Sequence, residues 1–207
     1  MIKDSLYYAK ILLFGEYGII ENSMGLSIPY HFFKGNFDFA KEPNEVQKNS
    51  NESIKDFADH LQSLHVSGGL PCALNFLQLQ GDIHSGLYFD SSIPQGFGVG
   101  SSGALVAALY AKYSVSPLKQ SDVMVGDNLK KLKSTLATME SFFHGKSSGL
   151  DPLICYLNLP ILVKGQGDLG TVGIPTENAE GKGAIFAPLA MGGAGALRGG
   201  GSPADRL

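Results

Sequence analysis

The sequence contains no tryptophan and only two cysteines, Cys72 and Cys155, which lie far apart in the chain. Two cysteines allow at most one disulfide, and they lack the spacing of a metal-binding pair. No apolar run approaches the roughly 20 residues that a membrane-spanning helix needs. The first ten residues carry charges without an apolar segment, so we expect no secretory signal there. These absences predict a cytoplasmic protein with free thiols and no membrane partner.

Charged residues are also scarce, at 17% of the chain with a net charge of −3. Such a balance provides no field that would attract nucleic acid. The one dense basic cluster, Lys130, Lys131 and Lys133, is typical of a solvated helix face. With 207 residues, 43% of them hydrophobic, the chain can bury one domain, or one domain and part of another.

Hydrophobic periodicity and turn residues predict an α+β fold. We expect a strand, a turn at Gly15-Glu16 and a second strand within residues 7–20, then a polar surface excursion over 35–53. A hairpin is expected about Gly81-Asp82. Asp151 is expected to cap a helix that has Pro152 at its first position. The remaining expected elements are helices over 54–64, 104–113 and 122–143, strands over 73–79, 86–93 and 159–163, and a helix end at Gly145.

The last part of the chain differs in composition from the rest. Residues 165–207 hold 12 of the 27 glycines, and beyond Phe186 neither helical nor strand periodicity is present. Such a segment has little apolar surface to offset its ordering entropy, so we expect disorder. We therefore predict a main domain over 1–164, the start of a second α+β domain over 165–187, and a glycine-rich tail over 188–207. The abrupt change suggests a chain truncated or frameshifted after about Phe186.

A glycine loop, Pro94-Gln-Gly-Phe-Gly-Val-Gly-Ser-Ser-Gly103, precedes the helix predicted over 104–113. Small residues allow the backbone to approach a phosphate, and the amides at a helix start favour an anion. The loop is no Walker A motif, because no lysine follows its last glycine. Gly98, Gly100 and Gly103 match a dinucleotide-binding pattern, although no strand with an acidic end follows. A glycine turn that binds nothing is a further alternative.

Three charged residues are candidates for chemistry, and each also has a structural interpretation. Asp151 at a helix start suits a general base, but the position taken alone is more typical of a capping aspartate. Glu140 lies close to the apolar stripe of its helix and therefore needs a partner: a structural cation, a metal such as magnesium, or hydrogen-bond donors. Lys10 is embedded in the apolar strand Tyr8-Ala-Lys-Ile-Leu-Leu-Phe, so it lines a cleft or reaches solvent along its stem.

Three motifs together resemble the galactokinase–homoserine kinase–mevalonate kinase–phosphomevalonate kinase superfamily. They are Lys10…Phe14-Gly15-Glu16, then Pro94…Gly98-Val-Gly100-Ser-Ser102, then Glu140…His144-Gly145…Ser148-Gly149-Leu-Asp151. The resemblance spans about residues 7–164, and the order and spacing fit the mevalonate kinases best. It implies the amino-terminal domain of such kinases, which resembles domain 2 of ribosomal protein S5, and transfer of the ATP γ-phosphoryl group to a primary alcohol in isoprenoid precursor synthesis.

The resemblance also implies a role for each matching residue. Asp151 and Lys10 would be catalytic, the former as base for the acceptor hydroxyl. Ser102 and Glu140 would hold Mg²⁺ on ATP. The residues expected to cradle the phosphates are Pro94, Gly96, Gly98, Val99, Gly100, Ser101, Ser102, Gly103 and Ala104, and those expected to face the substrate are Glu16, Tyr17, His144 and Ser148.

Three positions depart from the family pattern: Tyr17 replaces a usual histidine, Gly103 a usual alanine and Ser147 a usual proline. The change at Tyr17 leaves other acceptors open, such as phosphomevalonate or a sugar. A catalytically inactive remnant that binds nucleotide is the alternative from another class, and a homodimer is compatible with either.

Overall fold

The computed structural model describes residues 5–15, 24–123, 125, 127–164 and 168–171. All of them belong to one compact unit, Met1–Val172, while the second unit, Gly173–Leu207, lies outside the described residues. The predicted domain limits and the truncation after Phe186 therefore stay predictions. Among the described residues, no helix is both long enough and apolar enough to cross a membrane.

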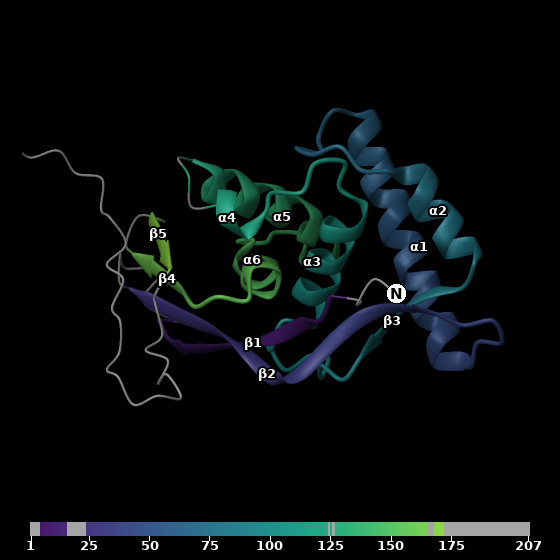
Figure 1. The fold of residues 1–207 in the computed structure, drawn as a ribbon, viewed down its shortest axis with the longest axis horizontal. Helices are drawn as coiled ribbons and strands as arrows, with labels where there is room; N and C mark the ends of the chain where they lie inside the picture. Colours follow the sequence, from purple (N-terminus) through teal and green to yellow (C-terminus); the bar gives the residue numbers. More distant parts are fainter. Residues whose placement is uncertain (1–4, 16–23, 124, 126, 165–167, 172–207) are drawn as a thin grey trace, which may run out of the picture. The chain divides into compact units, whose positions relative to one another are not determined.

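The described strands form a single antiparallel sheet, and helices cover one of its faces (Figure 1). The long strand β2 (Gly25–Phe39) pairs with β1 (Tyr7–Phe14), β3 (Leu87–Ser91) and β4 (Ile161–Lys164), and β4 pairs with β5 (Asp168–Thr171). The α+β fold class is confirmed. A dinucleotide-binding module would instead predict parallel strands, which the described sheet does not contain.

The helix α3 (Ser101–Tyr113) lies at the centre of the helical layer. Its buried residues, which include Ala104, Ala107, Ala108 and Leu109, lie on all sides of the helix. A helix that is apolar all round belongs in the core, and small alanines let its neighbours approach closely. Around it lie α1 (Glu45–Val66), α2 (Phe76–His84), α4 (Gln120–Val123), α5 (Asn128–His144) and α6 (Leu150–Leu157). In this position α3 contacts both the sheet and α6, so residues of all three lie close together at the candidate site.

Several predicted elements are confirmed, and three are wrong. The predictions are confirmed for strands β1, β3 and β4, for α3, for most of α5 and for the break at Gly15. The second strand expected by residue 20 falls mainly on 16–23, outside the described residues. The surface excursion over 35–53 is wrong, because residues up to Phe39 extend β2 and Glu45 begins α1 under a capping box formed by Asn44 and Gln47.

The hairpin about Gly81-Asp82 is also wrong. The segment expected as its first strand instead enters α2, where the Asn75 side chain accepts a hydrogen bond from the Gln78 amide. Local capping therefore overrides the apolar run. The third error concerns α6: its N-cap is Gly149, with a φ of 73°, so Asp151 lies inside the first turn rather than at the cap. The chain enters this helix two residues earlier than expected.

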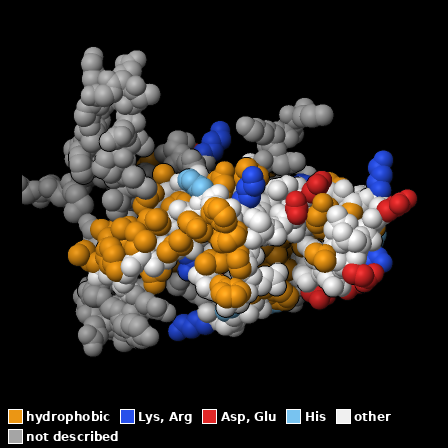
Figure 2. Space-filling view, turned by 90° about the horizontal axis from the view of Figure 1, so that it is seen from below, with side chains coloured by type: hydrophobic (Ala, Val, Ile, Leu, Met, Phe, Trp, Pro, Cys, Tyr) orange, Lys and Arg blue, Asp and Glu red, His pale blue; other side chains and the backbone are white. Residues whose placement is uncertain are grey.

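The other face of the sheet carries apolar side chains that the helices do not cover. Figure 2 shows hydrophobic side chains gathered on this side of the molecule. Large exposed apolar residues occur in both β1 and β2, with Leu13, Phe14 and Phe32 among them, whereas the Phe39 ring contacts Lys112 of α3. The charged groups of the candidate site lie on the helix-covered side, because Lys10 of β1 meets Asp151 of α6.

Candidate active site

The glycine loop brings the chain to the amino-terminal end of α3. Gly96, Gly98 and Gly100 adopt positive φ angles of 80°, 67° and 84°, a region that glycine enters at little cost. Gly100 is the N-cap and supplies no side-chain acceptor. The Ala104 amide donates to the Gly100 carbonyl oxygen, so the preceding amides of the first turn are those available to a ligand. An uncapped helix start of this kind suits a phosphate.

The loop is fastened to strand β1 at Lys10. The Lys10 backbone amide donates to the Val99 carbonyl oxygen at 2.9 Å. A methyl group at Gly100 would lie 2.9 Å from Lys10 Cγ, so a larger residue would displace the lysine side chain. Behind the loop, burial raises the pKa of the Cys155 thiol, which keeps it in the neutral form. The loop, the lysine and the helix start therefore form one packed unit.

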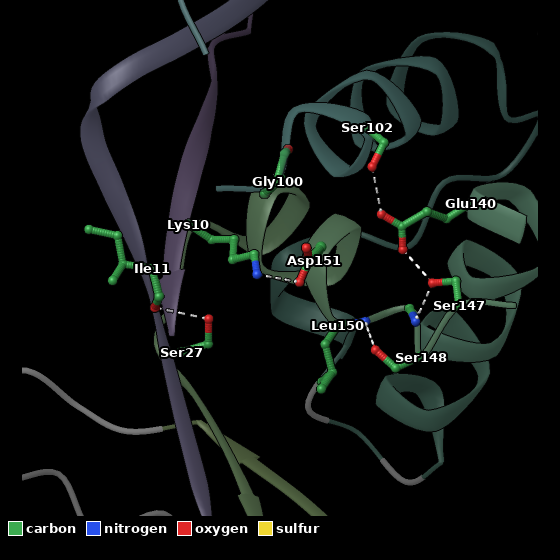
Figure 3. A network of polar contacts seen from close by, with 12 residues as sticks. Lys10, Ile11, Ser27, Gly100, Ser102, Glu140, Ser147, Ser148, Leu150 and Asp151 are labelled. Atoms are coloured by element: carbon green, nitrogen blue, oxygen red, sulfur yellow. Dashed lines mark hydrogen bonds and ion pairs between the residues drawn. The ribbon is translucent and has the colours of Figure 1, made fainter. Parts of the chain in front are cut away.

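Lys10 and Asp151 form an ion pair beside the glycine loop (Figure 3). Lys10 Nζ lies 2.9 Å from Asp151 Oδ1, and the two side chains are 11% and 34% exposed. Asp151 can reach this position because α6 passes very close to α3: a methyl group at Gly103 would lie 2.8 Å from both Asp151 C and Pro152 N. A half-exposed carboxylate, held by a buried ammonium group, is thus presented at the same edge as the loop.

Glu140 lies on the other side of this edge and is only 3% exposed. Its Oε1 accepts a hydrogen bond from Ser102 Oγ at 3.2 Å, and its Oε2 accepts a short one from Ser147 Oγ. Burial raises the pKa of Glu140 above its ordinary value, and the Ser147 hydrogen bond partly opposes that rise. Within the described residues, no lysine or arginine pairs with this carboxylate. The expectation that Glu140 needs a partner is met here by hydroxyl groups.

Of the four residues expected to face a substrate, the structure describes His144 and Ser148. His144 Nε2 lies 3.0 Å from Ser102 Oγ, which connects it to the Glu140 cluster. Ser148 is exposed, and its Oγ accepts a hydrogen bond from the Leu150 amide at 3.3 Å. Glu16 and Tyr17 lie outside the described residues. Pro94 and Gly96 lie in the loop, where Gly96 is exposed and a methyl group on it would meet no atom within 4 Å.

The oxygen donors at this edge fit a magnesium ion better than a softer metal. No group of three or more histidine, cysteine, aspartate or glutamate side chains suited to a metal occurs in the described part of the chain. Ser102 and Glu140 nevertheless provide a hydroxyl and a carboxylate oxygen 3.2 Å apart. Magnesium commonly takes one or two carboxylates from the protein and completes its shell with water and substrate phosphate. The residues therefore fit the ion if a nucleotide brings the remaining ligands.

A separate cleft of about 280 Å³ lies away from this edge, toward the other end of α3. Cys72, Tyr110 and Lys131 are among its lining residues, and none of the residues predicted for the site is. Burial raises the pKa of Cys72 to about 11, so its thiol is neutral near pH 7 and a poor nucleophile. The Cys72 thiol therefore gives this cleft no reactive nucleophile near pH 7.

Comparison with known proteins gives similarity to solved structures only. No protein-family model and no curated protein matches the chain. Mevalonate kinase from L. major, solved in complex with R-mevalonate, is 17% identical, with a TM-score of 0.47, and the match covers 84% of this chain and 53% of that one. The enzyme from methicillin-resistant Staphylococcus aureus MRSA252 is 15% identical, with a TM-score of 0.46 and coverage of 83% and 55%.

A third mevalonate kinase structure has a TM-score of 0.43 at 15% identity, and the match covers 81% of this chain and 55% of that one. The chain thus spans about half the length of the structures it resembles. At these levels the comparisons do not assign an activity, and the functional argument rests on the geometry of the site.

Sequence reasoning did not assign a role to Ser147. Its hydroxyl contacts the buried carboxylate of Glu140, although seven positions separate the two in the chain. The available signal was a hydroxyl residue in the glycine-flanked turn after the helix that carries Glu140. Only the fold shows that this turn folds back onto the helix.

Proposed function

We propose that the chain is an ATP-dependent phosphotransferase that acts on an alcohol. The observation that carries the proposal is the Lys10–Asp151 ion pair at the glycine loop, where the start of α3 offers amides to phosphate. Phosphoryl transfer needs little covalent chemistry from the protein beyond positioning and neutralisation of charge. An anion site, a general base and an ammonium group at one edge supply those needs.

Asp151 serves as the general base. Its carboxylate accepts the proton of the acceptor hydroxyl while the acceptor oxygen attacks the γ-phosphorus. The bond between that phosphorus and the β–γ bridging oxygen breaks, and ADP leaves with the electron pair. Lys10 Nζ, 2.9 Å from Asp151 Oδ1, holds the carboxylate in place and stabilises negative charge on the transferred group.

The loop and the two metal-ligand candidates orient the nucleotide. The amides of Ser101, Ser102 and Gly103 bind phosphate oxygens at the helix start. Ser102 and Glu140 would hold the magnesium ion, which neutralises charge on the β- and γ-phosphates when bound. Because these groups come from α3 and α5, the packing of the two helices fixes the nucleotide relative to Asp151.

The acceptor follows from the sequence motifs rather than from the site geometry. They resemble the mevalonate kinases most, so we propose the 5-hydroxyl of mevalonate as the acceptor. Tyr17, which departs from the family pattern, keeps phosphomevalonate and sugars as alternatives. Since the chain spans about half of the similar structures, an inactive nucleotide-binding remnant is the alternative that the assay must separate.

The test is ATP turnover by the purified chain with magnesium across a panel of alcohols that includes mevalonate. Turnover that depends on mevalonate supports both the reaction and the acceptor. Turnover with another alcohol supports the reaction and overturns the acceptor. Nucleotide binding without any turnover supports the inactive remnant, and absence of nucleotide binding contradicts the proposal as a whole.

A further inference from the structure

Ser147 links the buried Glu140 to the turn that leads into the Asp151 helix (Figure 3). Its hydroxyl donates to Glu140 Oε2 and accepts a hydrogen bond from the Gly149 amide at 2.9 Å. Gly149 is the N-cap of α6, and Asp151 follows two residues later. One hydroxyl group therefore connects the end of α5 to the start of α6.

The contact matters because Glu140 is almost inaccessible to water. Ser102 Oγ donates to Oε1 and Ser147 Oγ to Oε2, and no other donor to this carboxylate is present among the described residues. At 3% exposure, water cannot easily replace a lost donor. Without Ser147 the carboxylate would rotate or recruit another partner, and the direction of Oε1 toward Ser102 would change.

We propose that Ser147 is a positioning residue for magnesium–nucleotide binding: it orients the Glu140 carboxylate and couples it to the turn that carries Asp151. The inference rests on the proposed function, since it assumes that Ser102 and Glu140 hold the metal. Residues that hydrogen-bond to metal ligands fix the orientation of those ligands, and their loss typically weakens metal affinity by about 10- to 100-fold.

Neighbouring serines show that this role belongs to one position. Ser148 is exposed and accepts only from the Leu150 amide within the described structure. Ser141 follows Glu140 directly, but its Oγ donates to the Thr138 carbonyl oxygen of its own helix at 2.6 Å. Ser141→Ala therefore removes an equivalent hydroxyl from the same helix without touching the carboxylate, and serves as the matched control.

The test measures Mn²⁺ binding by electron paramagnetic resonance in the presence of a non-hydrolysable ATP analogue. Manganese prefers the same oxygen ligands as magnesium and reports binding without turnover. We expect Ser147→Ala to weaken binding by about tenfold, as for other residues that support metal ligands. Ser147→Thr should restore most of the affinity because it keeps the hydroxyl, and Ser141→Ala should bind like the wild type.

A second readout follows the turn itself. Hydrogen exchange of the Gly149 amide, measured without ligand, should be faster in Ser147→Ala and unchanged in Ser141→Ala. Melting temperatures of all variants, measured alongside, report whether the fold is kept.

The outcomes separate the inference from the proposed function. Equal manganese affinity in wild type and Ser147→Ala overturns the inference alone. Threonine that fails to rescue, or an affinity loss explained by unfolding at the assay temperature, also overturns it. A wild type that binds no manganese–nucleotide overturns the proposed function, and the inference with it.

Discussion

Two lysine–aspartate ion pairs lie at opposite ends of α3, and they differ mainly in what surrounds them. Lys10–Asp151 lies beside Gly100 and Gly103 at the amino-terminal end. At the other end, Lys112 Nζ lies 3.2 Å from Asp82 Oδ2, with side-chain exposures of 30% and 24%. Distance and burial alone would therefore not identify which pair belongs to the proposed site.

The pair at Lys112 is enclosed by aromatic rings. Lys112 Nζ lies 4.8 Å from the centroid of Phe39, and it also contacts the rings of Phe37 and Tyr113. The Tyr113 hydroxyl donates to Asp82 Oδ2 at 2.8 Å, and burial together with this carboxylate raises the tyrosine pKa. The Lys112 ammonium group thus contacts the Asp82 carboxylate and the aromatic rings, and the Tyr113 hydroxyl donates to the same carboxylate. Such mutual contacts are typical of a cluster that stabilises the fold. The Lys10 pair instead lies beside the uncapped start of α3, and a methyl group on Gly96 or Gly98 of the glycine loop would meet no atom within 4 Å, so the surroundings distinguish the two pairs.

The largest expected effect separates the two aspartates by activity. Asp151→Asn should lower kcat by about 10²- to 10⁴-fold, because the amide cannot accept the acceptor proton. Its nucleotide affinity should stay near that of the wild type, since the proposed phosphate site is formed by the loop and α3 rather than by Asp151. The measurements are steady-state turnover and nucleotide titration. Asp82→Asn, assayed where it is folded, is the control and should retain turnover. Equal losses in both variants would remove the distinction between the pairs.

The next effect tests the close approach of α3 and α6. Gly103→Ala should lower the free energy of unfolding by about 1–3 kcal/mol, because backbone atoms of Asp151 and Pro152 lie where its methyl group would go. Gly81→Ala in α2 is the matched control: its methyl group meets no atom within 4 Å, and it should stabilise by roughly 0.5–1 kcal/mol. Urea unfolding measures both. A Gly103→Ala variant as stable as the wild type would show that the helices separate easily.

The difference between the two ends of α3 also shows what could be predicted from sequence. Apolar periodicity was sufficient for β1, α3 and the buried stripe of α5, since burial along one element depends on local spacing. It was insufficient for α2, because the capping contact of Asn75 outweighed a strand-like apolar run. The motifs predicted a set of candidate site residues, and their roles stay predictions.

The contacts within the site were not predictable in the same way. Lys10 and Asp151 lie far apart in the chain, and only the packing of α6 against α3 and β1 brings them together. Local spacing likewise gave no reason to join Lys112 to Asp82, or Ser147 to Glu140. Long-range pairing depends on the arrangement of the elements, so resemblance to a family supplied the candidates that periodicity could not.

A smaller effect is expected at the structural pair. Lys112→Ala should lower the free energy of unfolding by about 1 kcal/mol, because it removes a partly exposed ion pair and the cation–π contacts around it. Its turnover and nucleotide affinity should match the wild type, since Lys112 lies at the far end of α3 from the glycine loop. Urea unfolding and steady-state kinetics measure the two quantities. Lost nucleotide affinity in a folded variant would mean that this end of α3 also takes part in function.

The smallest expected effect concerns the pH dependence of stability at Glu140. Burial raises the pKa of this carboxyl above its ordinary value of 4.5, so the folded protein keeps the proton at a pH where the unfolded chain has released it. Stability is therefore lost as the pH rises from 4.5 through the folded pKa. Glu140→Gln stays neutral, so it should be more stable than the wild type near neutral pH, and the difference should shrink on acidification.

Asp82→Asn is the control for this last prediction, because its expected effect on stability has the opposite sign. Asp82→Asn removes the negative charge that pairs with Lys112 and one of the two oxygens that could accept from Tyr113, so it should lower stability near neutral pH, whereas Glu140→Gln should raise it. Urea unfolding at a series of pH values upward from 4.5 measures both differences. A glutamine variant that is less stable than the wild type near neutral pH would contradict the assignment, because it would make Glu140 a stabilising carboxylate like Asp82. If Glu140→Gln is more stable than the wild type and binds manganese–nucleotide more weakly, then Glu140 lowers the stability of the fold while it contributes to nucleotide binding.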